Sequence, residues 1–124
     1  MATKFYKCRH CGNVIEKIVD SNVPVVCCGE PMEELIPNTV DASTEKHVPV
    51  VTQLDACTIK VNVGSTPHPM TEEHHIAFIY VETVRGGIRM NLKDSPEAVI
   101  CTCSGKPIAV YEYCNLHGLW KTEL

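Results

Sequence analysis

Four of the eight cysteines lie close together near the start of the chain. Cys8 and Cys11 form a C-x2-C-G loop, and Cys27 and Cys28 form an adjacent C-C-G pair. Four thiolates around a tetrahedral cation are a ligand set for zinc or iron, and a C-x2-C turn reaches two neighbouring corners. The following glycines free the backbone to bend so that its amides point at the sulfur atoms. The spacing predicts that all four cysteines hold one metal ion; two disulfides are the alternative.

A second group, of histidines and one cysteine, is spread over the rest of the chain. It comprises E-K-H-V-P at 45–49, P-H-P at 67–69, E-E-H-H at 72–75 and C-N-L-H-G at 114–118. Two prolines flank His68, fix its backbone and exclude regular structure there. Cys114 and His117 share one tight loop that presents a thiolate and an imidazole to the same point. Four imidazoles and one thiolate exceed the usual ligands of a structural zinc, and they suit an iron that keeps one of its six positions open for chemistry.

The elements that position these side chains are predicted to be strands. Five segments show the alternation of apolar and polar residues, or the β-branched and aromatic content, that is typical of strands: 57–63, 75–84, 88–92, 98–103 and 107–113. Arg85-Gly86-Gly87 is predicted to be a hairpin turn. No stretch sustains a helical period with caps, so little helix is expected. Several short strands with frequent turns predict an all-β chain built as an antiparallel sandwich.

A polar, turn-prone segment near residues 36–44 separates the N-terminal cysteines from five of the six histidines. A segment of about 35 residues cannot build a sufficient hydrophobic core, so a metal staple explains how it folds. The sequence therefore predicts two domains. Residues 1–36 surround the first metal, and residues 37–124 form the sandwich that holds the second.

Composition excludes several classes of partner. The formal net charge is −4 and no basic cluster is present, which argues against nucleic acid. No apolar run approaches the ~18–20 residues of a membrane span, and the first residues lack the apolar centre of a signal peptide. A cytoplasmic protein is expected, in which cysteines are metal ligands or buried thiols rather than disulfides. Cys57, Cys101 and Cys103 match no motif and are expected to be buried, inert thiols.

Taken together, the motifs resemble the desulfoferrodoxin type of two-iron superoxide reductase over nearly the whole chain. The N-terminal cysteine pattern is similar to desulforedoxin, and E-K-H-V-P, G-S-T-P-H-P-M, E-E-H and Y-C-N-L-H-G-x-W are similar to superoxide reductase motifs. The resemblance implies a small desulforedoxin-like, metal-stapled domain beside an immunoglobulin-like β-sandwich or barrel. It also implies two iron ions per chain. The first is an Fe(Cys)4 centre in which zinc is a possible substitute, and the second is held by His47, His68, His74, His117 and an axial Cys114.

The resemblance implies an activity as well: one-electron reduction of superoxide to hydrogen peroxide, which detoxifies superoxide under oxidative stress. Electrons would come from rubredoxin or a similar donor, and the protein would be a homodimer. The same resemblance places Glu45 and Lys46 on a loop over the open iron position. Its motif spacing favours His74 over His75 as the ligand. Successive side chains of an extended chain point to opposite sides, so His75 is expected to pack beside the site.

Other classes of protein fit parts of the pattern. An iron electron-transfer protein without catalytic activity would have both sites closed and would not react with azide or cyanide. A zinc-stabilised binding module would have no redox chemistry and no colour. A non-haem oxygenase ranks last, because its usual two-histidine, one-carboxylate set leaves more open positions than five protein ligands do.

Overall fold

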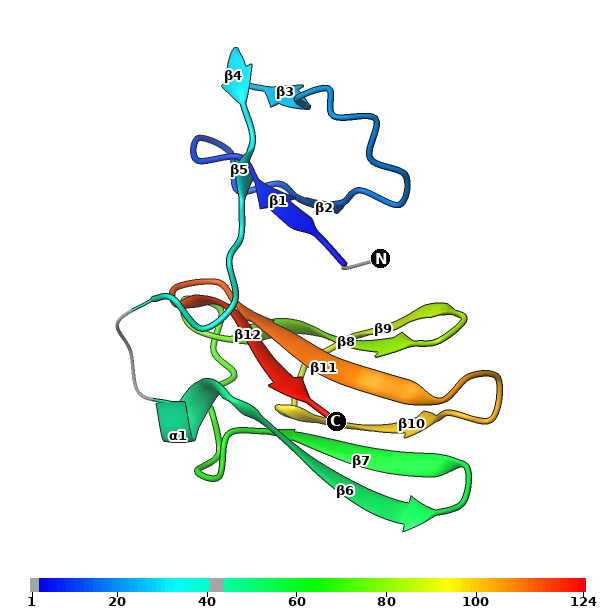
Figure 1. Ribbon diagram of the computed structural model, residues 1–124. Helices are drawn as coiled ribbons and strands as arrows, with labels where there is room; N and C mark the ends of the chain where they lie inside the picture. The colour runs from blue at the N-terminus through cyan, green and yellow to red at the C-terminus, as the bar shows by residue number, and fades with distance from the viewer. Residues whose placement is uncertain (1–2, 41–43) are drawn as a thin grey trace. The chain divides into compact units, whose positions relative to one another are not determined.

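The computed structural model describes residues 3–40 and 44–124, and the chain divides into two compact units, Met1–Ile36 and Pro37–Leu124 (Figure 1). The prediction of an all-β chain is confirmed. Among the described residues, regular helix is confined to the single turn α1 (Thr44–His47). No helix in the described ranges has the length and apolar character needed to cross a membrane.

The first unit consists of very short strands. β1 (Phe5–Lys7) pairs on one side with β2 (Val14–Glu16) and on the other with β5 (Glu33–Glu34), in both cases antiparallel. β3 (Val26–Cys27) and β4 (Glu30–Pro31) form a separate hairpin. Among the described residues of this unit, the buried apolar side chains are Phe5 and Cys8. Two such residues are no hydrophobic core, so the fold of this unit depends on its metal site.

The second unit is a sandwich of two antiparallel sheets, visible in Figure 1 as the lower and upper layers of this unit. One sheet has the order β10-β7-β6 and the other the order β12-β11-β8-β9. The strands are β6 (Pro49–Asp55), β7 (Thr58–Val63), β8 (Ile76–Thr83), β9 (Gly86–Asn91), β10 (Glu97–Cys101), β11 (Pro107–Cys114) and β12 (Gly118–Glu123).

The core lies between the two sheets, and it is mostly aliphatic. β7 alternates strictly between half-buried and buried residues, as the period of two in its sequence predicts. The cluster of buried side chains comprises Ile59, Val61, Val63, Ile76, Ile79, Val81, Ala98, Ile100, Val110 and Cys114. Cys114 belongs to this core, so the end of β11 is fixed by packing as well as by its hydrogen bonds to β8 and β12.

Two sequence expectations need correction. Strands β6 and β12 were not among the five predicted segments, because their apolar residues do not alternate regularly. The expectation that three unassigned cysteines are buried is wrong: Cys101 and Cys103 are exposed, and Cys57 is half-buried. Cys57 and Cys103 are joined by a disulfide, so the expectation of free, inert thiols at these two positions is also wrong. Residues 98–101 are all apolar, so the sequence could not show which alternate pair faces the core.

Candidate metal centres

The five side chains predicted to hold the second metal converge at one end of the sandwich. His47 ends α1, His68 and His74 lie in the loop between β7 and β8, Cys114 ends β11, and His117 lies in the turn before β12. One nitrogen or sulfur atom from each lies within 4.8 Å of the corresponding atoms of the others. His75 points elsewhere: its Nδ1 lies 2.9 Å from the carbonyl oxygen of Thr71, within its own loop.

The four imidazoles of this group form a closed ring. Neighbouring rings meet edge to face with centroid distances of 4.6–5.0 Å, in the order His47, His68, His74, His117 and back to His47. His74 therefore lies across the ring from His47, and His117 lies across from His68. Cys114 Sγ lies 3.5 Å from His68 Nε2 and 3.8 Å from His117 Nδ1. Because Cys114 is fully buried in the core, its sulfur closes the inner side of the ring.

The distances between nitrogen atoms fit a shared metal ion. His47 Nε2 lies 3.2 Å from His68 Nε2 and 3.0 Å from His117 Nδ1. Two imidazole nitrogens at right angles about a metal, each bound at about 2.1 Å, lie about 3.0 Å apart. His74 Nε2 is buried and has no hydrogen-bond partner, which is costly for a polar atom unless a cation takes its lone pair. The donor set therefore fits one metal ion.

Burial favours the neutral, metal-binding form of two of the imidazoles. The pKa of His68 falls to about 4, mainly because burial removes water from the charged ring. The pKa of His74 is also lowered, again mainly by burial. A proton on His68 Nδ1 is donated to the carbonyl oxygen of Pro69, 2.8 Å away, which leaves Nε2 free to bind metal. Burial raises the pKa of Cys114, so a bound cation is needed to hold it as a thiolate.

Two residues that sequence reasoning missed hold the ligand loops in place. Asn115 Oδ1 accepts a hydrogen bond from the backbone N–H of His75, and Asn115 Nδ2 donates to the carbonyl of Glu73, each at 2.9 Å. These two bonds join the loop that carries His74 to the loop that carries Cys114. Trp120 contacts the histidines themselves, through a stacked ring and a hydrogen bond. Both residues lie inside the C-N-L-H-G-x-W motif, which was the available signal.

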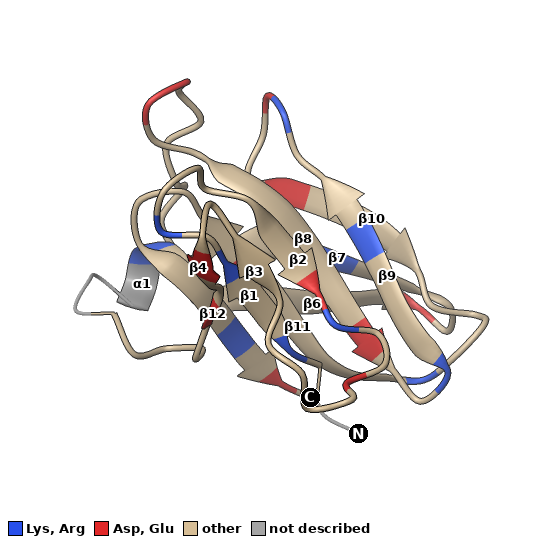
Figure 2. Ribbon diagram, turned by 90° about the horizontal axis from the view of Figure 1, so that it is seen from above, with Lys and Arg blue, Asp and Glu red and all other residues tan. Residues whose placement is uncertain are grey.

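The described charged side chains of this protein form no large patch of one sign, and Lys46 is the cation next to this group in the sequence. Figure 2 shows basic and acidic segments interspersed along the strands, with no long run of one sign. Lys46 lies in α1, directly before His47, and its side chain is exposed. Its positive charge contributes to lowering the pKa of His74, after burial and the neighbouring imidazoles. The side chain of Glu45 lies outside the part of the chain that the structure describes.

The four N-terminal cysteines form a second group of converging donors. Cys11 Sγ and Cys27 Sγ lie 3.6 Å apart, close to the about 3.8 Å expected for two sulfurs bound to one metal at about 2.3 Å in a tetrahedron. The backbone N–H of Cys11 donates to Cys8 Sγ at 3.5 Å, as the C-x2-C turn predicts. Asn13 Nδ2 donates to Cys27 Sγ at 3.6 Å, a contact that sequence reasoning missed. These donors stabilise negative charge on sulfur.

Without a cation, one thiol of this group ionises more readily than usual and two others ionise less readily. The pKa of Cys8 is lowered to about 6, first of all because the Cys11 backbone N–H donates to it. Hydrogen bonds with Cys11 and Cys8 raise the pKa of Cys28 to about 12 and also raise that of Cys27. Ionisation of one thiol thus makes ionisation of the next one less favourable. A bound metal cation stabilises all the thiolates together. Four thiolates around one ion fit iron and zinc alike.

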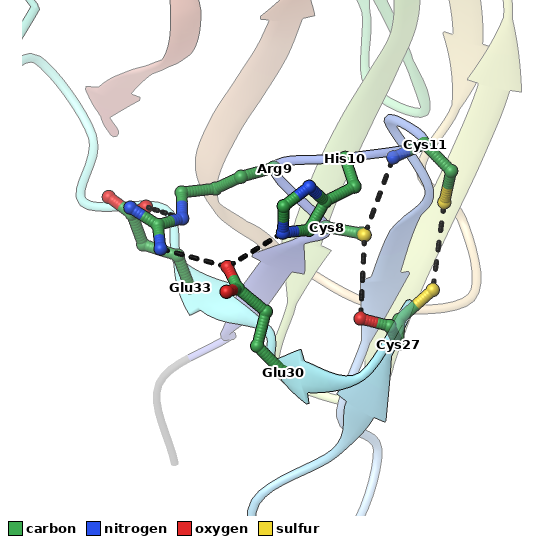
Figure 3. Close-up of polar contacts among 7 residues, drawn as sticks. All are labelled: Cys8, Arg9, His10, Cys11, Cys27, Glu30 and Glu33. Carbon is green, nitrogen blue, oxygen red and sulfur yellow. Dashed lines mark hydrogen bonds and ion pairs between the residues drawn. The ribbon is translucent and has the colours of Figure 1, made fainter.

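A surface cluster of charges fastens the loop that carries the first two cysteines (Figure 3). Arg9 Nη2 donates to Glu30 Oε1 at 2.8 Å, and Arg9 Nε lies 4.0 Å from Glu33 Oε2. His10 Nε2 lies 3.0 Å from the same Glu30 oxygen. Exposed pairs of this kind contribute little stability. Their effect is to connect the C-x2-C loop to β4 and β5 beside the cysteine group.

The fold and the two donor groups define a non-haem metalloprotein with one site of four cysteines and one site of four histidines and a cysteine. The desulfoferrodoxin family model matches residues 39–123, and the model of the desulfoferrodoxin N-terminal domain matches residues 2–35. The chain therefore belongs to the desulfoferrodoxin family. Its two metal sites correspond to the two iron centres expected for that family, which confirms the prediction of two sites.

Individual relatives are similar to this chain in sequence or structure over most of its length. A desulfoferrodoxin from Nitratidesulfovibrio vulgaris is 47% identical over 124 residues, covering 97% of this chain and 95% of that protein. A superoxide reductase from Pyrococcus horikoshii is 37% identical over 103 residues, covering 68% of this chain and 90% of that protein. The crystal structure of the superoxide reductase from Treponema pallidum has a TM-score of 0.81 at 32% identity, with 99% of this chain and 100% of that chain covered.

Proposed function

We propose that this chain is a superoxide reductase that converts superoxide to hydrogen peroxide at the iron held by its four histidines and one cysteine. The observation that carries the proposal is the closed ring of four imidazoles with one buried thiol on its inner side. Five protein donors leave one of the six positions that iron prefers for an exogenous anion. The superoxide reductases among its relatives and structural neighbours support the same activity.

Each part of the group has a task in this reaction. When bound, the iron supplies the single electron that superoxide takes up. His47, His68, His74 and His117 are the proposed nitrogen ligands, and burial lowers the pKa of His68 and of His74. Cys114 is the proposed thiolate, which donates electron density from the inner side. Four neutral imidazoles and one thiolate leave a divalent ion with a net charge of about +1, which favours an approaching anion.

Glu45 and Lys46 are the proposed residues on the open side of the site. Lys46 is exposed and adjoins His47, so its ammonium adds a local positive charge to a chain of net charge −4. Such a charge speeds the arrival of an anionic substrate. Glu45 precedes it, and its carboxylate is the proposed oxygen ligand of the oxidised site, because oxygen donors suit harder ions.

The remaining assignments concern the partners and the surroundings of the enzyme. We propose a rubredoxin-like electron donor, a homodimer and a cytoplasmic location. The N-terminal unit holds the first iron at Cys8, Cys11, Cys27 and Cys28, and residues 37–124 carry the catalytic site. Whether electrons pass through the first iron is decided by comparing turnover with and without that site.

The stoichiometry of the product tests the proposed activity. A reductase forms one hydrogen peroxide from each superoxide, with one electron from the donor and two protons. Dismutation forms one hydrogen peroxide and one dioxygen from two superoxides. We expect the first ratio, with donor oxidation equal to superoxide consumed and no dioxygen released. The dismutation ratio, or a second iron that reacts with neither superoxide nor azide, would overturn the proposal.

A further inference from the structure

The disulfide between Cys57 and Cys103 lies far from the metal group of its own unit. It joins the turn between β6 and β7 to the loop between β10 and β11, at the end of the sandwich drawn on the right of Figure 1. β11 runs from Pro107, near this end, to Cys114 at the metal group. Seven steps along an antiparallel strand span about 24 Å. The disulfide is therefore separate from the catalytic machinery.

Hydrogen bonds join the two segments that carry these cysteines without help from the sulfur atoms. The N–H of Thr102 donates to the carbonyl of Cys57 at 2.6 Å, and the Thr102 hydroxyl donates to the same oxygen at 3.2 Å. The N–H of Cys57 donates to Asp55 Oδ1 at 2.9 Å. The Cα atoms of Cys57 and Cys103 lie 4.8 Å apart, within the range that a disulfide requires. The reduced thiols would therefore stay side by side, ready to close again.

The bond is also open to reagents in solution. Cys103 is exposed and Cys57 is half-buried, and the residues that precede them in the chain, Thr102 and Ala56, help to line a hollow of about 860 Å³. Thiol exchange requires that a thiolate reach one sulfur of the bond, so this access permits reduction. Cys101 is exposed too, but it is a free thiol. It lies across from Thr58 in the ladder between β7 and β10.

We infer that Cys57 and Cys103 form a reversible thiol pair, which hydrogen peroxide closes and small-molecule thiols such as glutathione reopen. One thiolate sulfur attacks the peroxide O–O bond and becomes a sulfenic acid, with release of water after proton uptake. The second thiol then attacks that sulfur, the S–S bond forms, and a second water leaves. Two thiols are oxidised and one peroxide is reduced to two waters. The choice of oxidant rests on the proposed function, of which peroxide is the product.

Closing the pair changes the stability of the sandwich. The two cysteines are 46 residues apart, so the bond closes a long loop and lowers the conformational entropy of the unfolded chain. A crosslink of this span is expected to raise the melting temperature of the second unit by about 10 °C or more. The protein would thus become more resistant to unfolding as its own product accumulates.

The test uses the full, iron-loaded protein. It is treated with excess reduced glutathione, freed of the reagent, exposed to one equivalent of hydrogen peroxide, and mapped by differential alkylation and mass spectrometry. We expect Cys57 and Cys103 to be alkylated together after glutathione and protected together after peroxide, while Cys101 stays alkylated. The melting temperature should rise in parallel. Cys103→Ser should abolish both changes, and the matched control Cys101→Ser should keep both.

Two results would overturn the inference. If the disulfide persists in excess glutathione, the pair is not reversible. If peroxide oxidises Cys101 as readily as Cys57 and Cys103, the reaction is not selective for the pair. A second arm replaces added peroxide with superoxide and an electron donor. If added peroxide closes the pair but superoxide turnover does not, the thiol pair stands and the proposed function fails.

Discussion

The indole of Trp120 stacks on the imidazole of His47, with ring centroids 5.1 Å apart and an angle of 22° between the planes. Trp120 Nε1 also donates to the carbonyl oxygen of His117 at 3.0 Å. One buried side chain thus contacts the imidazole of one proposed ligand and the backbone of another, and it lies outside the group of metal donors.

Replacing Trp120 should therefore weaken both the fold and the hold on metal. We expect Trp120→Ala to lower the free energy of unfolding by about 3–5 kcal/mol, because it leaves a cavity. Metal affinity should fall by about 10- to 100-fold, which is the usual loss when a residue that orients a metal ligand is replaced. Trp120→Phe keeps a ring but loses the donor, so its losses should be smaller. Denaturant unfolding and competition with a chelator measure the two effects; wild-type iron retention in the Ala variant would contradict this role.

The adjacent residues His74 and His75 form a matched pair for testing the ligand set. His74→Ala removes a nitrogen donor, Nε2, that has no hydrogen-bond partner. Iron affinity should therefore fall by more than about 100-fold, the upper end of the loss for a residue that only orients a ligand. His75→Ala removes only contacts within its loop, so iron content and the absorption of the second centre should persist. Iron analysis after chelation compares the two variants. A greater loss in His75→Ala would mean that the wrong histidine was assigned, and equal losses would contradict a distinct role for His74.

Glu112 makes the stability of the sandwich depend on pH. Both carboxyl oxygens are buried without a hydrogen-bond partner, and burial raises the pKa of Glu112 to about 9. The unfolded chain ionises near pH 4.5 while the folded chain keeps the proton, so stability falls as pH rises towards 9, by about 1.4 kcal/mol per unit. Glu112→Gln should remove that slope. Urea unfolding of both proteins at several pH values between about 7 and 9 tests this. If the unfolding free energies of the wild type and of Glu112→Gln change with pH in the same way, the prediction is wrong.

Lys46 is expected to attract the anionic substrate. Lys46→Ala should slow the second-order reaction with superoxide by about tenfold and flatten its dependence on ionic strength. The iron spectrum should hardly change, since no ligand is lost. Lys46→Arg should keep most of the rate, because attraction needs charge more than shape. Lys106, at the other end of the sandwich, offers a control in Lys106→Ala. Pulse radiolysis at several salt concentrations measures these rates, and equal salt slopes in both Ala variants would leave Lys46 without this role.

The two metal sites should be separable. Cys11→Ser removes one of four sulfur ligands, so the absorption of the Fe(Cys)4 centre should vanish and residues 3–36 should become sensitive to protease. Superoxide reduction by chemically reduced enzyme should continue, because the donors of the second site all lie in the other unit. Cys101→Ser replaces an exposed free thiol and should change neither property. Loss of the superoxide reaction with the second iron still bound would show that the sites depend on each other.

The sequence by itself determined the chemistry of this protein. Donor identity and short spacings are local properties, so the C-x2-C-G and C-C-G segments and the histidine motifs sufficed to predict two metal groups. All nine predicted donors meet in those two groups, although their roles as ligands remain a prediction. Strict alternation sufficed for β7, where each apolar residue has polar neighbours.

Only the tertiary structure decided how these parts meet. The stacking of Trp120 on His47 and the pairing of Cys57 with Cys103 join residues that are at least 46 positions apart, and the ring of four imidazoles brings together three separate segments of the chain. No local periodicity encodes such contacts, because they depend on how two sheets pack. The phase of β10 was ambiguous for the same reason: four consecutive apolar residues fit either face. In the structure β10 pairs with β7 so that Ala98 and Ile100 lie in the core and Cys101 is exposed.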